Sequence, residues 1–116
     1  NYLRYFERGR SDFLRTAGVV HTELARRDRP LAFAVIGMDI KFKKAARIDN
    51  SLLIQTEYHS LEGIRFHIHQ KITRQNDKGG QDIICTAKVE VVVIDFQGNP
   101  QRPPKEMVES LGEYFV

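Results

Sequence analysis

The chain has 116 residues, of which 41% are hydrophobic and 28% are charged, with a formal net charge of +3. This length and composition predict one globular domain over residues 1–116, and they exclude a disordered chain or a membrane helix of about 20 apolar residues. The single cysteine, Cys85, excludes an internal disulfide, and no secretory apolar segment is recognised, so we expect a cytoplasmic protein.

Residues 1–17 are predicted to form an amphipathic helix. Their apolar side chains recur at spacings of three, four and seven. Gly18 follows the last of them and suits a C-terminal stop. Gly9 lies on the apolar stripe, where glycine costs about 1 kcal/mol relative to alanine, so we expect it to permit close approach to a sheet. No N-cap residue precedes Asn1, so the start of this helix is expected to lie upstream.

Residues 19–30 end at Pro30 and predict a short helix or a loop. Alternation over residues 32–43 predicts a strand. One face of that strand would carry Ala34, Ile36, Met38, Ile40 and Phe42, and the other Asp39, Lys41 and Lys43.

Two more strands, 52–60 and 64–75, are predicted around a Glu62-Gly63 turn. Counting through this turn places Tyr58 opposite His67 and Thr56 opposite His69. The same count turns His59 to the opposite face, together with Phe66.

The remaining segments complete the predicted sheet. Residues 76–80, Asn-Asp-Lys-Gly-Gly, form a strong turn signal. The apolar run 83–94 predicts a central strand, with Ile83, Cys85, Ala87, Val89, Val91 and Val93 on one face. Prolines precede a short terminal helix over 105–114. The order of elements predicts an α+β domain in which an antiparallel sheet wraps one long helix.

Few residues offer chemistry. His67 and His69 share a strand face, but a third metal ligand is not evident, so we expect no metal site and interpret the pair as part of a polar face or subunit interface. Cys85 lies in the most apolar strand and is predicted to be a buried structural thiol. Glu7 lies among arginines and is either a base or half of an intrahelical ion pair with Arg4 or Arg10.

The order of several segments resembles the hotdog-fold acyl-CoA thioesterases, in particular the 4-hydroxybenzoyl-CoA thioesterase-like group that includes Tol-Pal-associated enzymes. The segments that carry the resemblance are 1–15, 33–35, 40–50, 53–57, 66–72 and 87–95. One departure is Phe42-Lys43-Lys44-Ala45-Ala46-Arg47, where the family often has Tyr-x-x-Pro-Ala-Arg.

The resemblance implies a hotdog domain whose first strand and catalytic loop are missing from this chain, so the domain is expected to be N-terminally incomplete. The family's catalytic Asp would lie upstream of Asn1 and maps to no position here. Glu7 stays a secondary catalytic candidate, because a related subfamily uses a helix glutamate.

The implied activity is hydrolysis of an acyl-CoA thioester to free coenzyme A and a carboxylic acid, without a cofactor. The amides at the start of the helix, near Asn1 and Tyr2, would polarise the carbonyl. Candidate contacts to coenzyme A are Arg47, His59, Ser60, Gly63 and Arg65.

The resemblance also implies a homodimer or a dimer of dimers, which is a homotetramer. The face bearing Asp39, Lys41, His67 and His69 is the candidate for the second interface. Alternatives are a hotdog dehydratase acting on acyl thioesters, or a noncatalytic acyl-CoA-binding or partner-binding subunit of envelope or lipid-synthesis machinery. The basic balance of residues 1–80 permits RNA binding, but the chain lacks an aromatic stacking motif, so nucleic acid is not an expected partner.

Overall fold

The computed structural model describes residues 2–19, 24, 26, 27, 29–44 and 51–112. Its elements are α1 (Tyr2–Thr16), β1 (Leu31–Phe42), β2 (Leu52–Glu62), β3 (Arg65–Gln75), β4 (Gln81–Asp95), β5 (Pro100–Gln101) and α3 (Lys105–Gly112). Both predicted helices and all four long strands are confirmed. Half of the residues in the predicted segment 19–30 lie outside the described residues, so that prediction is not tested. No helix among the described residues is long and apolar enough to cross a membrane.

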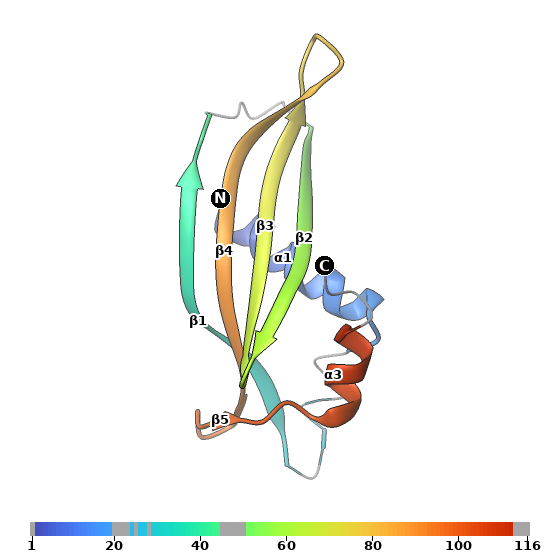
Figure 1. The fold of residues 1–116 in the computed structure, drawn as a ribbon, viewed down its shortest axis with the longest axis vertical. Coiled ribbons are helices and arrows are strands. Elements are labelled where there is room, and N and C mark those ends of the chain that lie inside the picture. Colours follow the sequence, from blue (N-terminus) through green and yellow to red (C-terminus); the bar gives the residue numbers. More distant parts are fainter. Residues whose placement is uncertain (1, 20–23, 25, 28, 45–50, 113–116) are drawn as a thin grey trace.

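The four long strands form one antiparallel sheet in the order β1-β4-β3-β2, and the short β5 pairs with β4. β4 is central, as its Val- and Ile-rich sequence predicts. α1 crosses one face of the sheet, while α3 lies beside its lower end (Figure 1). This arrangement confirms the predicted α+β domain with one long helix against an antiparallel sheet.

The helix α1 packs unusually close to the sheet at Gly9. A Cβ atom at position 9 would lie 2.8 Å from Thr56 Oγ1 and 2.9 Å from a methyl carbon of Ile54, which confirms the predicted close approach. Phe6 and Leu14, one or two turns away, are buried against the sheet.

Gly18 ends α1 as predicted. It has a φ of 84°, and the amide of Val19 donates to the Leu14 carbonyl at 2.8 Å while the amide of Gly18 donates to the Arg15 carbonyl at 3.1 Å. These bonds form a Schellman motif, which satisfies carbonyls that the helix leaves unpaired.

The predicted faces of β1 are wrong in its first half. Val35 pairs with Val91 and Gly37 with Glu90, so Ile36 is an extra residue that bulges out of the ladder. The bulge reverses the alternation: Phe33 packs against the core on the same side as Met38, whereas Ile36 is 49% exposed.

The β2–β3 turn lies one residue further along than predicted. Gly63 and Ile64 form it, and only Gly63 has a positive φ (61°), as a type II′ turn requires at its first central position. The displaced turn places Ser60, and not Tyr58, opposite His67. A bulge at His59 then shifts the pairing back by one residue, so that Glu57, and not Thr56, lies opposite His69.

The predicted orientation of His59 is therefore wrong. Its ring stacks on that of His69, with centroids 4.4 Å apart and an interplanar angle of 11°, so both lie on one sheet face. Phe66 is fully buried in the core cluster under α1.

A further irregularity in β4 corrects the face of Ile83. Thr73 pairs with Ile83 but Ile72 pairs with Cys85, which leaves Ile84 extra. As a result Ile84 is fully buried and Ile83 is 43% exposed. The faces predicted for Cys85, Ala87 and later residues are confirmed by their burial.

Candidate functional site

A groove of about 300 Å³ runs between α1 and the sheet. Its lining residues are Glu7, Arg10, Ser11, Leu14, Phe33, Val35, Tyr58 and Val91. The helix supplies Glu7, Arg10 and Ser11, while the strands supply a mainly apolar wall that includes the ring of Tyr58. Such a groove suits a ligand that has a polar reacting group and an apolar or aromatic portion.

Arg10 is fixed at this groove by a buried glutamine. Its Nη1 donates to Gln70 Oε1 at 2.8 Å, and Gln70 Nε2 donates to the Phe6 carbonyl at 2.8 Å and to Thr56 Oγ1 at 2.9 Å. Burial lowers the pKa of Arg10, whereas the nearby Tyr58 and Glu7 act to raise it. Helix and sheet are thus joined by one polar network, of which Arg10 lines the groove.

Tyr58 forms part of the apolar wall. It is 1% exposed and stacks on Phe13 with ring centroids 4.5 Å apart. Burial raises the pKa of Tyr58, against the opposing effect of Arg10, so the phenol stays neutral at physiological pH. Tyr58 therefore shapes the groove and does not act as a base.

Glu7 is an exposed carboxylate that borders the groove. The alternative ion pair with Arg4 or Arg10 is not formed in the described part of the chain. The ion pair within α1 instead joins Arg15 to Asp12 at 3.5 Å. The Glu7 carboxylate is accordingly available to a water molecule or a ligand in the groove.

The hairpin candidates lie beside carboxylates. Arg65 Nη1 is 3.6 Å from Glu90 Oε2, and His67 lies between Glu62 and Glu90 at 3.6 and 3.9 Å. Ser60 faces His67 across the ladder. The charge of Arg65 is thus shared with an acidic partner before any phosphate arrives.

Within one copy of the chain, the candidate at the start of α1, Tyr2, lies far from the candidates in the β2–β3 hairpin. The ring of Tyr2 lies 5.5 Å from that of Phe42, which is in register with Cys85 and, through it, Ile72. Arg65 is at the other end of β3, and the separation along the strand is about 23 Å at about 3.3 Å per residue. Asn1 and Arg47 lie outside the described residues.

The outer sheet face holds the histidines in an arrangement unsuited to a shared metal. Ring nitrogens bind metals in the plane of the ring, so the parallel rings of His59 and His69 do not converge on one ion. The described residues contain no group of three or more His, Cys, Asp or Glu side chains placed to hold a metal. Burial, and then the positive charges of His59 and Lys88, lower the pKa of His69.

Cys85 and Gln70 are both buried, and only the first was predicted to be. Cys85 is fully buried and burial raises the pKa of its thiol, as expected of a structural cysteine. Gln70 was missed by the sequence reasoning, although it alternates in phase with the apolar Phe66, Ile68 and Ile72. A polar residue at a core position was the available signal.

Residues 1–111 match the family model of the thioesterase-like superfamily. The chain belongs to this superfamily. A curated superfamily relative, "Acyl-CoA thioesterase YbgC" of Haemophilus influenzae, is 30% identical over 107 residues, which cover 91% of this chain and 74% of the relative. The predicted resemblance is confirmed.

Solved structures of thioesterases have a similar fold. A probable thioesterase from Bartonella henselae is 43% identical, with a TM-score of 0.79 over 89% of this chain and 81% of that one. A 4-hydroxybenzoyl-CoA thioesterase variant complexed with 4-hydroxybenzoyl-CoA has a TM-score of 0.87 at 16% identity, covering 96% of this chain and 82% of that one. The second likeness concerns the fold alone, and it confirms the hotdog architecture.

Proposed function

We propose that residues 1–116 act as one domain that hydrolyses an acyl-CoA thioester to free coenzyme A and a carboxylic acid. The observation that carries this proposal is the similarity, over 91% of the chain, to a protein named an acyl-CoA thioesterase. The groove beside α1 supports it, because a carboxylate borders an apolar wall there.

The chemistry needs a group that activates water and a group that stabilises the developing oxyanion. Glu7, the secondary catalytic candidate from the sequence, is the described carboxylate that borders the groove. As the base it would accept a proton from water while the water oxygen adds to the thioester carbonyl carbon. Amides at the start of α1 would stabilise the oxyanion. The carbon–sulfur bond then breaks and the coenzyme A thiol takes up the proton, a sequence that requires no cofactor.

A homodimer formed along β1 accounts for the separated candidates. β1 is an edge strand whose outer side has no strand partner in the described chain, and Val35 and Ile36 on it are 46% and 49% exposed. Two copies of β1 paired about a two-fold axis run in opposite directions. The hairpin of a second copy would therefore approach the start of α1.

The outer sheet face is our candidate for joining two dimers into a homotetramer through Asp39, Lys41, His67 and His69. These residues lie on strands β1 and β3, on a face that carries no described helix. We place the enzyme in the cytoplasm. Its proposed partners are envelope proteins, such as those of the Tol-Pal system, or lipid-synthesis proteins. The sole cysteine supports the cytoplasmic assignment.

Thiol release from a panel of acyl-CoAs tests the reaction on the full natural chain. We expect turnover by the unaltered protein, and a fall in kcat of at least about 100-fold in Glu7→Gln, which is the usual contribution of a general base. Asp12→Asn, which changes another exposed carboxylate of α1, should leave kcat unchanged.

Different outcomes address different parts of the proposal. Tight acyl-CoA binding with no thiol release from any substrate would overturn hydrolysis in favour of a noncatalytic binding subunit. Thiol release that Glu7→Gln does not alter would leave hydrolysis standing and remove Glu7 from the mechanism.

A further inference from the structure

Arg10 is a half-buried cation in the groove beside α1, and the described residues offer it no carboxylate partner. It forms no ion pair with any of them, since the charge of Glu7, three residues earlier on the helix, acts from beyond ion-pair distance. A guanidinium has five N–H donors, and the described bond to Gln70 uses one of those of Arg10. The other donors are therefore open to a ligand that enters the groove.

Gln70 holds the guanidinium at this place. Both N–H bonds of its amide are directed elsewhere, to the Phe6 carbonyl and to Thr56 Oγ1, so the amide oxygen is left to accept from Arg10. If Arg10 turned out to solvent, that buried oxygen would lose its donor, which is costly. The cation is thus positioned before any ligand arrives.

Tyr58 lines the same groove and brings a second donor. It is 1% exposed. Its described contacts are made by the ring, which stacks on Phe13 and meets Phe66 edge-on, while its hydroxyl forms no hydrogen bond with a described residue. The charge of Arg10 acts on the pKa of Tyr58, so the two groups lie near each other. A buried hydroxyl without a partner is costly, and a ligand that accepts from it removes that cost.

We infer that Arg10 and Tyr58 recognise a carboxylate at the far end of the acyl group, so that the preferred substrates are CoA thioesters of dicarboxylic acids. A carboxylate has two oxygens, which can accept from the guanidinium and from the phenol, and hydrogen bonds to an ionised group are the strong ones. Phe33 and Val91 of the groove wall would contact the methylene groups between the two ends. This inference names the substrate class of the groove and rests on the proposed function.

The groove sets the length of the acyl group. Its volume of about 300 Å³ is at the lower end of the range for small-ligand sites, about 300–1,000 Å³. Along the helix axis, Arg10 is about 4.5 Å from Glu7 and about 12 Å from the start of α1 at Tyr2. A short dicarboxylic chain therefore fits if the carbonyl reacts beside Glu7, and a longer one if it reacts at the start of α1.

Thiol release on the full natural chain tests the preference. Glutaryl-, adipyl- and suberyl-CoA are each compared with the neutral acyl-CoA of the same chain length, which are pentanoyl-, hexanoyl- and octanoyl-CoA, after subtraction of the uncatalysed rate. We expect kcat/KM to be at least about tenfold higher for the dicarboxylic member of at least one pair, because the neutral member leaves both donors without a partner.

Two variants remove the donors separately. Arg10→Gln should reduce the preference for the dicarboxylic member at least about tenfold, and Tyr58→Phe at least about threefold, whereas kcat/KM for the neutral members should stay within about threefold. Tyr58→Phe keeps the ring contacts, so it tests the site even if Arg10→Gln weakens the fold. Arg8→Gln is the matched control, because it removes the same charge from an exposed position of α1 that does not line the groove. Thermal unfolding shows whether each variant is folded.

Calorimetry separates this inference from the proposed hydrolysis. The probes are the thioether analogues of adipyl-CoA and hexanoyl-CoA, in which a methylene group replaces the thioester carbonyl. If no acyl-CoA releases thiol but the adipyl analogue binds at least about tenfold more tightly, hydrolysis fails and the carboxylate site is supported. Equal kcat/KM within every pair, or a preference that Arg10→Gln and Tyr58→Phe alter no more than Arg8→Gln does, would overturn the site while hydrolysis is retained.

Discussion

At the scale of single residues, Gln70 joins parts of the chain that lie far apart in sequence. It is 3% exposed, and its amide bonds the Phe6 carbonyl, 64 residues away. The same side chain accepts from Arg10 and donates to Thr56. Its removal would leave buried polar groups unsatisfied, and such groups are costly.

Gln70→Leu keeps a similar volume but removes all of these bonds. We expect the free energy of unfolding to fall by about 2–4 kcal/mol, because Arg10 and the Thr56 hydroxyl lose their partner. Urea denaturation measures the change. Gln55→Leu, on an exposed position of β2, is the control and should shift the midpoint little. Equal effects of the two substitutions would contradict a structural role for the network.

Gly9→Ala should destabilise the protein despite the better helix propensity of alanine. The new methyl would meet Thr56 and Ile54, whose short branched side chains cannot swing away, and the bound Gln70. Overpacking of this kind costs about 1–3 kcal/mol, which outweighs the gain of about 1 kcal/mol in propensity. Gly112→Ala, with no atom near its added methyl, serves as the control in thermal unfolding. A higher Tm for Gly9→Ala would mean that the helix can lift without cost.

The stacked histidines predict an acid-sensitive fold. Burial and the neighbouring positive charges of His59, Lys88 and His67 lower the pKa of His69, with Glu57 opposing them. The unfolded chain therefore binds a proton at this residue more readily than the folded one, so the stability is full above the ordinary histidine pKa of about 6.5 and declines as pH falls below it.

The variant His69→Gln tests whether His69 causes this loss of stability at low pH. Because glutamine does not titrate, the drop in Tm between about pH 7.5 and about pH 5.5 should be smaller in the variant than in the unaltered protein. Differential scanning calorimetry at both pH values measures it. An unchanged pH dependence would assign the acid sensitivity to other groups.

At the scale of elements, periodicity predicted each helix and long strand, and bulges account for the errors. Period-2 counting fails after an inserted residue, as it did at Ile36, His59 and Ile84. Of these three bulges, only the one at Ile36 could have been predicted, because the next residue, Gly37, is an isolated glycine within a strand.

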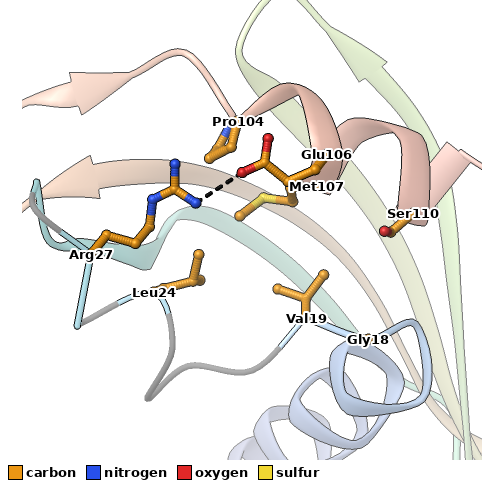
Figure 2. Close-up of a pocket in the computed structure, with 8 residues that line it drawn as sticks. All are labelled: Gly18, Val19, Leu24, Arg27, Pro104, Glu106, Met107 and Ser110. Atoms are coloured by element: carbon orange, nitrogen blue, oxygen red, sulfur yellow. Dashed lines mark hydrogen bonds and ion pairs between the residues drawn. The ribbon is translucent and has the colours of Figure 1, made fainter.

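The candidate site was predicted less completely than the fold. Glu7 and its arginine neighbours were visible because they are adjacent in sequence. The contact of Arg10 with Gln70 was not, since it depends on how α1 sits over β3. The ion pair of Arg27 with Glu106 was likewise not visible, because these residues are 79 apart in sequence (Figure 2).

The edge strand β1 carries the prediction for the dimer. Ile36→Lys adds a charge to an already exposed position, so the monomer should fold normally while the dimer dissociates at least about tenfold more readily. Sedimentation equilibrium measures the constant. Leu53→Lys, at an exposed apolar position on the opposite edge strand β2, is the control. Stronger dissociation in the control would place the interface on β2.

At the scale of the whole molecule, the two sheet faces differ in chemistry. One face holds the apolar core under α1, whereas the outer face carries mixed charges that include Asp39 opposite Lys88 and His67 opposite Glu90. An interface on the outer face would be polar, whereas one along β1 would rest on backbone pairing. The two should respond differently to salt.

Raising the ionic strength from about 0.1 M to about 1 M shortens the screening length from about 10 Å to about 3 Å. We expect tetramers joined by the outer face to separate into dimers, and the dimers joined along β1 to persist. Light scattering after size-exclusion chromatography distinguishes these species. A tetramer that passes directly to monomers would contradict this order of assembly.

Because position 9 is a glycine, α1 lies close to the sheet, and this closeness affects which substrates fit. The height of α1 above the sheet fixes the width of the groove whose walls are Phe33 on one side and Ser11 on the other. Gly9 lines no part of that groove, yet it sets the spacing between the two walls. In an enzyme that works there, a bulkier residue at this position would widen the passage and shift preference toward larger acyl groups. Selectivity among acyl groups would then depend on how closely α1 packs on the sheet, and so on a residue that does not line the groove.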